Sequence, residues 1–165
     1  MGPLAEYLKN EAETIRKEKG RRQAALKEWM DLLDGLFRQI DNWLAACDPD
    51  GLLDRTTDSI AISDPAIGEY EAPLRRIEVA NKLIEIVPKA RYVAASIRPP
   101  GSDKPIRAHG LVELRESGIT CYYLFQLPGG KWYIQNEARN LRESDNAVDL
   151  LDAERFEAAL TSLVR

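Results

Sequence analysis

The sequence predicts an α+β fold. We expect a long N-terminal helix or helical hairpin, a short β-hairpin, a second helix, a four-stranded antiparallel meander and a C-terminal helix. Three observations support this order: apolar residues recur at helical spacing over the first 47 positions, turn pairs separate extended segments between positions 91 and 136, and an amphipathic stretch closes the chain. We divide the chain into a helical region, 1–50, and an α+β domain, 51–165.

The first helix is predicted from Pro3 to Cys47, because apolar residues follow an alternating spacing of four and three without an interior proline. As one straight rod it would be about 67 Å long, whereas a compact domain of this size is about 40 Å across. The helix therefore either breaks near Gly20 or Gly35 and folds back, or its first half projects and finds a partner. The turn residues of 48–51 end it.

The segment 55–73 predicts a short hairpin around Asp64-Pro65. The next segment, 73–87, predicts a helix, because its apolar side chains share one arc at 100° per residue, it begins with Pro73, and Pro88 directly follows it. Two strands that meet at Asn81-Lys82 are the alternative, since the segment is rich in β-branched residues.

Four strands are predicted near 91–98, 106–115, 119–127 and 131–136. Ser117-Gly118 and Gly129-Gly130 resemble the pairs found in two-residue hairpin turns. Those turns place Leu114 opposite Cys121 and Phe125 between Gly110 and Ile134, which gives one apolar face across three strands.

The chain ends in a predicted helix that starts at about Asp152. The Asp152 side chain is the expected cap, and Leu151 is expected to pack against Phe156. The complete order of elements resembles the NTF2-like cone fold, in which helices pack on a curved sheet with a cavity between them. The resemblance covers topology alone, rests on no residue motif and assigns no site residue; the final helix departs from the simplest version of that fold.

The chain's single histidine, His109, falls on the mixed face of the predicted sheet. This face is either a half-solvated surface of cross-strand polar pairs or a ligand pocket in which His109 and Glu113 are a base and its orienting carboxylate. No catalytic residue is assigned; His109 and Glu113 are the two to test. The candidate ligand-binding residues are Arg107, His109, Glu113, Tyr122, Gln126 and Tyr133.

The first helix supplies the second group of candidate residues. An over-length amphipathic helix is typical of a protein-binding or coiled-coil element. The candidate partner-binding residues are Leu8, Ile15, Leu26, Trp29, Phe37 and Trp43. A basic run, 16–22, favours nucleic acid only weakly, because acidic residues interrupt it and the chain has a net charge of −4; its bases are Arg16, Lys17, Lys19, Arg21 and Arg22.

From these patterns we expect a non-catalytic interaction module, such as an adaptor, a regulator or a subunit of an assembly, that binds a protein partner or its own copy through the N-terminal helix. The alternatives are a small-ligand binder or isomerase/hydratase-like enzyme that uses the His109 face, and a nucleic-acid accessory factor.

Composition bounds these expectations. The chain is 44% apolar and 30% charged, as in ordinary globular proteins. No apolar run approaches the roughly 20 residues that cross a bilayer, and the first residues lack a signal-peptide pattern, so we expect a cytoplasmic location and no membrane contact. No phosphate-binding, dinucleotide-binding or metal-binding motif is present, so we expect no cofactor and no metal. Cys47 and Cys121 are expected to be buried reduced thiols.

Overall fold

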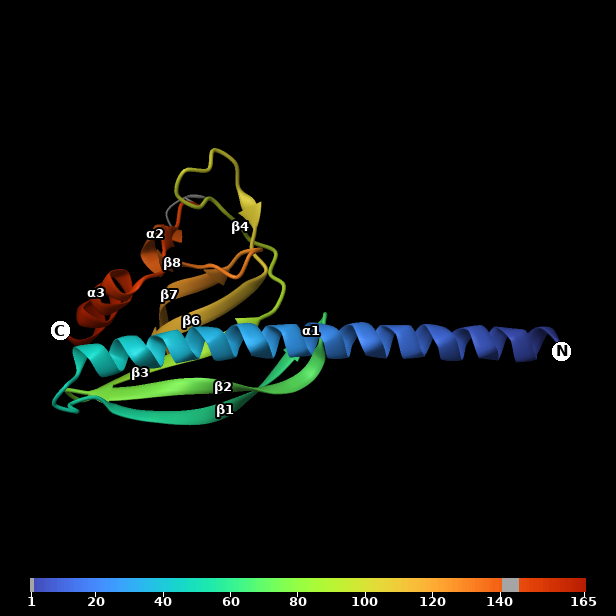
Figure 1. Cartoon of the computed structure of the whole chain (residues 1–165), viewed down its shortest axis with the longest axis horizontal. Helices are drawn as coiled ribbons and strands as arrows, with labels where there is room; N and C mark the ends of the chain where they lie inside the picture. Colours follow the sequence, from blue (N-terminus) through green and yellow to red (C-terminus); the bar gives the residue numbers. More distant parts are fainter. Residues whose placement is uncertain (1, 141–145) are drawn as a thin grey trace.

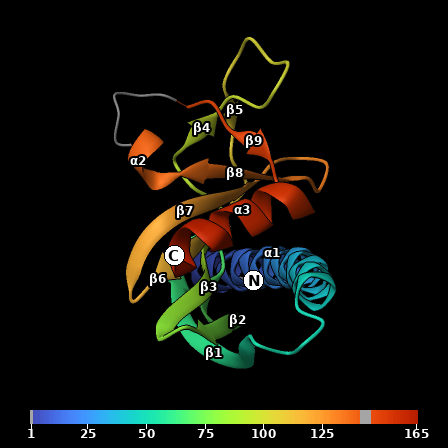
Figure 2. The same cartoon turned by 90° about the vertical axis from the view of Figure 1, so that its left-hand side faces the viewer.

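The computed structural model describes residues 2–140 and 146–165, and it confirms the α+β class (Figure 1). A seven-stranded sheet in the order β1-β2-β3-β6-β7-β8-β9 has helices α1 and α3 on one face, and each neighbouring strand pair is antiparallel (Figure 2). The elements are α1 (Pro3–Cys47), β1 (Asp54–Asp64), β2 (Gly68–Val79), β3 (Lys82–Ala90), β4 (Ser96–Ile97), β5 (Ile106–Arg107), β6 (Gly110–Glu116), β7 (Ile119–Gln126), β8 (Trp132–Asn136), α2 (Glu137–Asn140), β9 (Asp149–Leu150) and α3 (Ala153–Val164).

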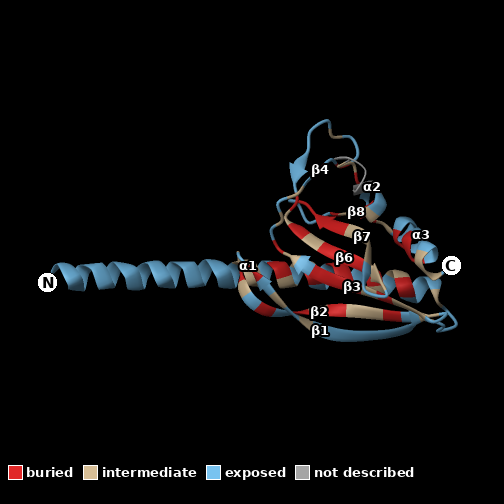
Figure 3. Cartoon of the chain, turned by 180° about the vertical axis from the view of Figure 1, so that it is seen from behind, coloured by how far each residue is buried: buried red, intermediate tan, exposed pale blue. Residues whose placement is uncertain are grey.

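Helix α1 is continuous over 45 residues, so the break at Gly20 or Gly35 does not occur. Its second half lies on the sheet, and its first half projects beyond it (Figures 1 and 3). The buried positions follow the predicted stripe, because residues three and four apart share one face of a helix. They are Trp29, Leu33, Leu36, Phe37, Ile40 and Leu44.

The hairpin around Asp64-Pro65 is confirmed as β1 and β2, which pair along their whole length. The buried Asp64 carboxylate accepts hydrogen bonds from the backbone N–H of Ala66 at 2.8 Å and of Arg91 at 2.9 Å. One aspartate therefore closes the turn and holds the chain where it leaves β3.

The helix predicted for 73–87 is wrong, and the alternative of two strands is confirmed, although β2 and β3 meet at Ala80-Asn81, one residue before the expected Asn81-Lys82. Both turn residues have positive φ, 51° and 65°, as a two-residue hairpin requires. Pro73 is tolerated because this part of β2 pairs with β1 alone, and Pro88 lies beside an irregularity in the β3–β6 pairing. The order of elements that suggested the NTF2-like cone contained this helix.

The meander is confirmed for β6, β7 and β8, but its predicted first strand is wrong. Of the segment 91–98, Ser96–Ile97 is a strand, and it pairs with β5 outside the main sheet, while β3 pairs with β6. The predicted register is also wrong by one residue. Cys121 is bulged, so that Leu114 pairs with Tyr122. Five residues connect β7 to β8, with Gln126 paired to Trp132, so that Phe125 pairs with Tyr133. Because the two register shifts cancel, β8 turns the predicted side chains toward the core. In β7 the two faces are exchanged, so that the side chains predicted to face the core lie on the other side of the sheet.

The core lies between the sheet and the two helices. Trp29 is fully buried in it: its indole N–H donates to the Tyr70 hydroxyl at 2.9 Å, and its ring lies 6.1 Å from that of Trp132. A Cβ placed on Gly110 would stand 2.6 Å from the Trp29 ring, so Gly110 makes room for the helix rather than for Phe125 as the predicted register implied.

Helix α3 begins as predicted. Asp152 caps it, since its carboxylate accepts from the backbone N–H of Arg155 at 2.8 Å. Leu151 and Phe156 both lie in the core, and Phe156 contacts the Trp43 ring of α1 at 5.6 Å. A second, smaller apolar cluster around Phe125 and Leu127 fills the space under β4, on the opposite face of the sheet.

We expect Gly110→Ala to lower the free energy of unfolding by about 1–3 kcal/mol, because the added methyl group overlaps the Trp29 ring, which is fixed on both sides. Chemical denaturation measures the change. Gly35→Ala is the control: nothing lies within 4 Å of its added Cβ, so this variant should gain up to about 1 kcal/mol in helix propensity. Equal effects from both substitutions would contradict the predicted close contact.

We expect Ala80→Gly to raise the free energy of unfolding by about 1 kcal/mol, since alanine holds a left-handed backbone in the β2–β3 turn. Ala45→Gly, on the exposed side of α1, should lower it by a similar amount. Thermal melts of the two variants test the difference in sign; a loss of stability in Ala80→Gly would show that the turn is not strained.

Candidate functional site: the projecting half of helix α1 and its base

The projecting half of α1, Pro3–Ala24, is called the arm below. Each of its residues is exposed. Its large apolar side chains stand in solvent with 55–68% of their surface accessible, a high value for residues that proteins usually bury. They are Leu4, Tyr7, Leu8 and Ile15.

The apolar stripe of the arm continues the buried face of the same helix. At 100° per residue, Leu4, Leu8 and Ile15 project within the same arc of about 40° as Leu33, Ile40 and Leu44 of the core. The sheet covers this arc over the second half of α1 and ends before the arm (Figure 3). The arm therefore presents a core-like face with nothing packed on it among the described residues.

A cleft of about 310 Å³ lies where the arm meets the domain. Ile67, from the β1–β2 turn, is its wall on the sheet side. The helix supplies the remaining lining residues: Ile15, Glu18, Lys19, Arg22, Gln23 and Leu26. The exposed stripe thus passes into a concave surface at its inner end.

The predicted partner-binding residues divide into three groups. Leu8 and Ile15 are exposed on the arm. Leu26 and Trp43 are partly buried against the core. Trp29 and Phe37 are fully inside it, so the interpretation of these two as partner contacts has to be corrected: they hold α1 on its own sheet.

The basic run 16–22 is fully exposed on the arm. At 100° per residue its five bases spread around the helix instead of gathering on one side. A helix that binds in a groove of nucleic acid gathers its basic side chains on one face, so this geometry gives the nucleic-acid alternative little support. Lys19 and Arg22 alone share the arc of the apolar stripe.

Arg91 anchors the base of the arm. Its side chain is 2% exposed and donates to the Glu28 carboxylate at 2.7 Å and to the His109 carbonyl. The guanidinium lies over Tyr92 at 4.6 Å and near Trp29 at 5.9 Å, and its Nε has no hydrogen-bond partner among the described residues. A buried charge held from several sides fixes where α1 leaves the domain.

The structure does not assemble the predicted base and orienting carboxylate. The His109 ring makes an edge contact with Tyr92 at 5.9 Å, while the Glu113 carboxylate binds Arg115 at 2.6 Å. His109 and Glu113 are four residues apart along extended chain, about 13 Å. Arg107 is exposed on β5 and donates to the Val93 carbonyl.

Two predicted ligand-binding residues lie on the other face of the sheet, because the faces of β7 are exchanged. The Tyr122 hydroxyl is 2.9 Å from Ser162 of α3, and Gln126 is buried near Arg91. Tyr133 keeps the predicted side and packs on the smaller cluster. The six candidates therefore do not line one cavity.

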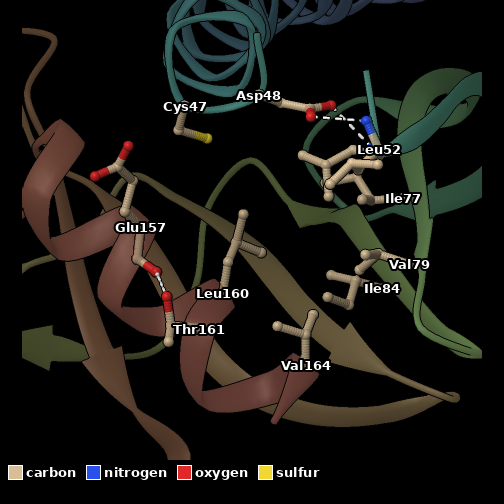
Figure 4. Close-up of a pocket in the computed structure, with 11 residues that line it drawn as sticks. Cys47, Asp48, Leu52, Ile77, Val79, Ile84, Glu157, Leu160, Thr161 and Val164 are labelled. Atoms are coloured by element: carbon tan, nitrogen blue, oxygen red, sulfur yellow. Dashed lines mark hydrogen bonds between the residues drawn. The ribbon is translucent and has the colours of Figure 1, made fainter. Parts of the chain in front are cut away.

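A second cleft, of about 410 Å³, lies at the opposite end of the packed half of α1, between that helix end, β2, β3 and α3 (Figure 4). Its wall is mainly aliphatic, and four polar side chains also line it: Cys47, Asp48, Glu157 and Thr161. The aliphatic lining residues are Leu52, Leu53, Ile77, Val79, Ile84, Leu160 and Val164.

Cys47 is the nucleophilic group at this cleft, and the predicted burial of its thiol is wrong, because the residue is exposed at the helix end. Partial burial of the thiol raises its pKa, and the nearby Glu157 carboxylate raises it further. Hydrogen bonds from the backbone N–H groups of Leu53 and Leu52 lower the pKa of Asp48. The cleft thus holds a protonated thiol between carboxylates, which is the opposite of an activated cysteine.

Within residues 2–140 and 146–165, no group of three or more histidine, cysteine or acidic side chains is placed to hold a metal ion. Over the same residues, no helix combines the length and apolarity needed to cross a membrane. Comparison of the chain with protein-family models finds no match, and comparisons with curated proteins and with solved structures also find none.

We expect Cys47 to react slowly with alkylating agents near neutral pH, because its raised pKa leaves little thiolate. Glu157→Gln should speed the reaction, since removal of the negative charge lowers the pKa of the thiol; the gain is limited because burial is the larger cause. Rates against pH in a Cys121→Ser background measure this. Glu154→Gln, in the first turn of α3, should change nothing, and an unchanged rate in Glu157→Gln would refute the interpretation.

Proposed function

We propose that this chain is a non-catalytic interaction module, an adaptor, regulator or subunit of an assembly, that associates with protein through the arm. One observation carries the proposal: a continuous helix repeats the apolar stripe of its buried half along the outer part of its exposed half, at Leu4, Leu8, Ala12 and Ile15.

Helix energetics supports this function. Most of the stability of a protein helix comes from packing of its apolar face, which the arm lacks among the described residues, and Gly20 weakens the arm by up to about 1 kcal/mol relative to alanine. A partner that covers the stripe would bury the apolar side chains of the arm, as the sheet buries those of the second half of α1. Burial of each large aliphatic side chain contributes about 1.5–3 kcal/mol, against an association cost of at least about 4 kcal/mol. The stripe suits an interaction of modest affinity unless the cleft at Ile67 is used as well.

The described groups favour binding over catalysis. The polar side chains tested as catalytic candidates are engaged in structural contacts: Glu113 with Arg115, and His109 with Tyr92. The exposed thiol carries a raised pKa. These contacts give the ligand and enzyme alternatives no assembled set of reactive groups.

We expect Leu8→Glu/Ile15→Glu to abolish association of the full chain. Light scattering measures self-association. Fluorescence anisotropy measures binding to a neutral helical peptide that has leucine at the positions facing the arm and glutamine at the positions beside them. The reason is that the two carboxylates enter the middle of the stripe. The loss should exceed tenfold in Kd.

Asn10→Glu/Ala24→Glu is the matched control, because it adds the same charge to the exposed opposite side of the arm. This variant should behave as the unmodified chain. If the unmodified chain neither self-associates nor binds the peptide, or if both variants act alike, the arm is not an association element.

A further inference from the structure

We propose that the partner of the arm is an amphipathic helix of a different protein, with carboxylates on its apolar face opposite Lys19 and Arg22, and not a second copy of this chain. This inference rests on the proposed function and adds the chemistry of the partner.

The seam that a partner must cover has two parts. Its outer part is apolar and consists of Leu4, Leu8, Ala12 and Ile15. Its inner part is cationic, because Lys19 and Arg22 project within the same arc of about 80°. Both cations line the cleft beside Ile67, and no ion pair of the described residues includes either of them.

A parallel pair of arms would place these cations against themselves. Positions that face the partner in a parallel coiled coil meet their own equivalents, so Lys19 would face Lys19 and Arg22 would face Arg22 of the second copy. Like charges opposed in a partly desolvated seam are unfavourable.

An antiparallel pair of arms meets a different obstacle. The register that aligns the seam places Ala12 opposite Ile15 and Leu8 opposite Lys19 of the second copy, so the cations face aliphatic side chains. The flanking positions then bring Glu11 beside Glu18 and Lys9 beside Arg16. Self-pairing in this register therefore leaves the cations without carboxylates and adds like-charge contacts.

A helix of another protein removes both obstacles when it carries acidic side chains at the two opposing positions. Each carboxylate then lies close to Lys19 or Arg22 at the cleft beside Ile67, where the two cations outnumber the one acidic lining residue, Glu18. The aliphatic stems of Lys19 and Arg22 still contribute apolar contact. Although the chain as a whole is acidic, the arm carries six basic and four acidic side chains, which favours an acidic partner.

The test compares three synthetic helical peptides of about three heptads that differ only at the two seam positions facing Lys19 and Arg22. These positions carry glutamine, glutamate or lysine. Anisotropy titrations with the full chain at low and high salt should rank glutamate tightest, with an advantage over lysine of about tenfold that shrinks in high salt. Lys19→Glu/Arg22→Glu should reverse the order of the two charged peptides. Lys9→Glu/Lys17→Glu, an equal change of charge outside the seam, should keep it.

The outcomes separate this inference from the proposed function. Equal binding of all three peptides, or unchanged ranking in Lys19→Glu/Arg22→Glu, overturns the acidic partner and leaves the arm as an interaction element. The acidic partner is also overturned, and the arm remains an interaction element, if the full chain is a dimer by light scattering and Leu8→Glu/Ile15→Glu converts it to a monomer. Failure of every peptide to bind a monomeric chain overturns both.

Discussion

The contacts of Trp29 with β2 and β6 fix the position of helix α1 on the sheet. Trp29 fills the space over Gly110 and donates to Tyr70, while the neighbouring Glu28 binds the buried Arg91. These contacts join the helix at one point to β2, to β6 and to the residue that follows β3. Every residue of α1 up to Ala24 is exposed, and nearly every apolar residue after Trp29 packs in or against the core.

This anchor and the sheet hold the second half of the over-length helix straight. Gly20 and Gly35 permit a break, but neither position has a conformation that demands one. After Trp29, the sheet holds the helix by apolar burial and by the two hydrogen bonds between Asp41 and Arg75 at 3.1 Å, and a break at Gly35 would disrupt this packing. A break at Gly20 would lie eight residues before Glu28 and would leave the contact between Glu28 and Arg91 in place, so the straight course of the arm rests on the backbone hydrogen bonds of the helix itself.

Much of the architecture could be predicted from the sequence because its signals are local. The helical stripe, the Asp64-Pro65 hairpin, the Asp152 cap and the Ser117-Gly118 turn depend on residues close together in the chain. The segment 73–87 was ambiguous, because its apolar residues fit a helical arc nearly as well as strand alternation. A turn at Ala80-Asn81 also lacks the glycine that usually signals one.

The candidate site was harder to predict for a different reason. Residues 121–125 are apolar or aromatic at each position, so alternation cannot assign either face of β7. The bulge at Cys121 then decides the matter, and it moved Tyr122 and Gln126 from the supposed pocket to the helix side. The cleft beside Ile67 was beyond reach, since it joins residues about 45 positions apart. By contrast, helix length left two outcomes for Leu8 and Ile15, a fold-back or a projecting half, and the continuous helix shows that the second is the case.

Because one unbroken helix runs through both the arm and the core, it fixes the distance and the rotation between them. A partner seated on the arm is held at a set azimuth relative to the sheet, because each residue between them contributes about 1.5 Å of rise and 100° of rotation. Seven residues added between Ile15 and Leu26 would move such a partner outward by about 10 Å and turn it by only about 20°. Two added residues would turn it to the far side of the molecule while hardly changing its distance. The geometry of any assembly built on this chain is therefore set by the count of residues in α1 as much as by their identity.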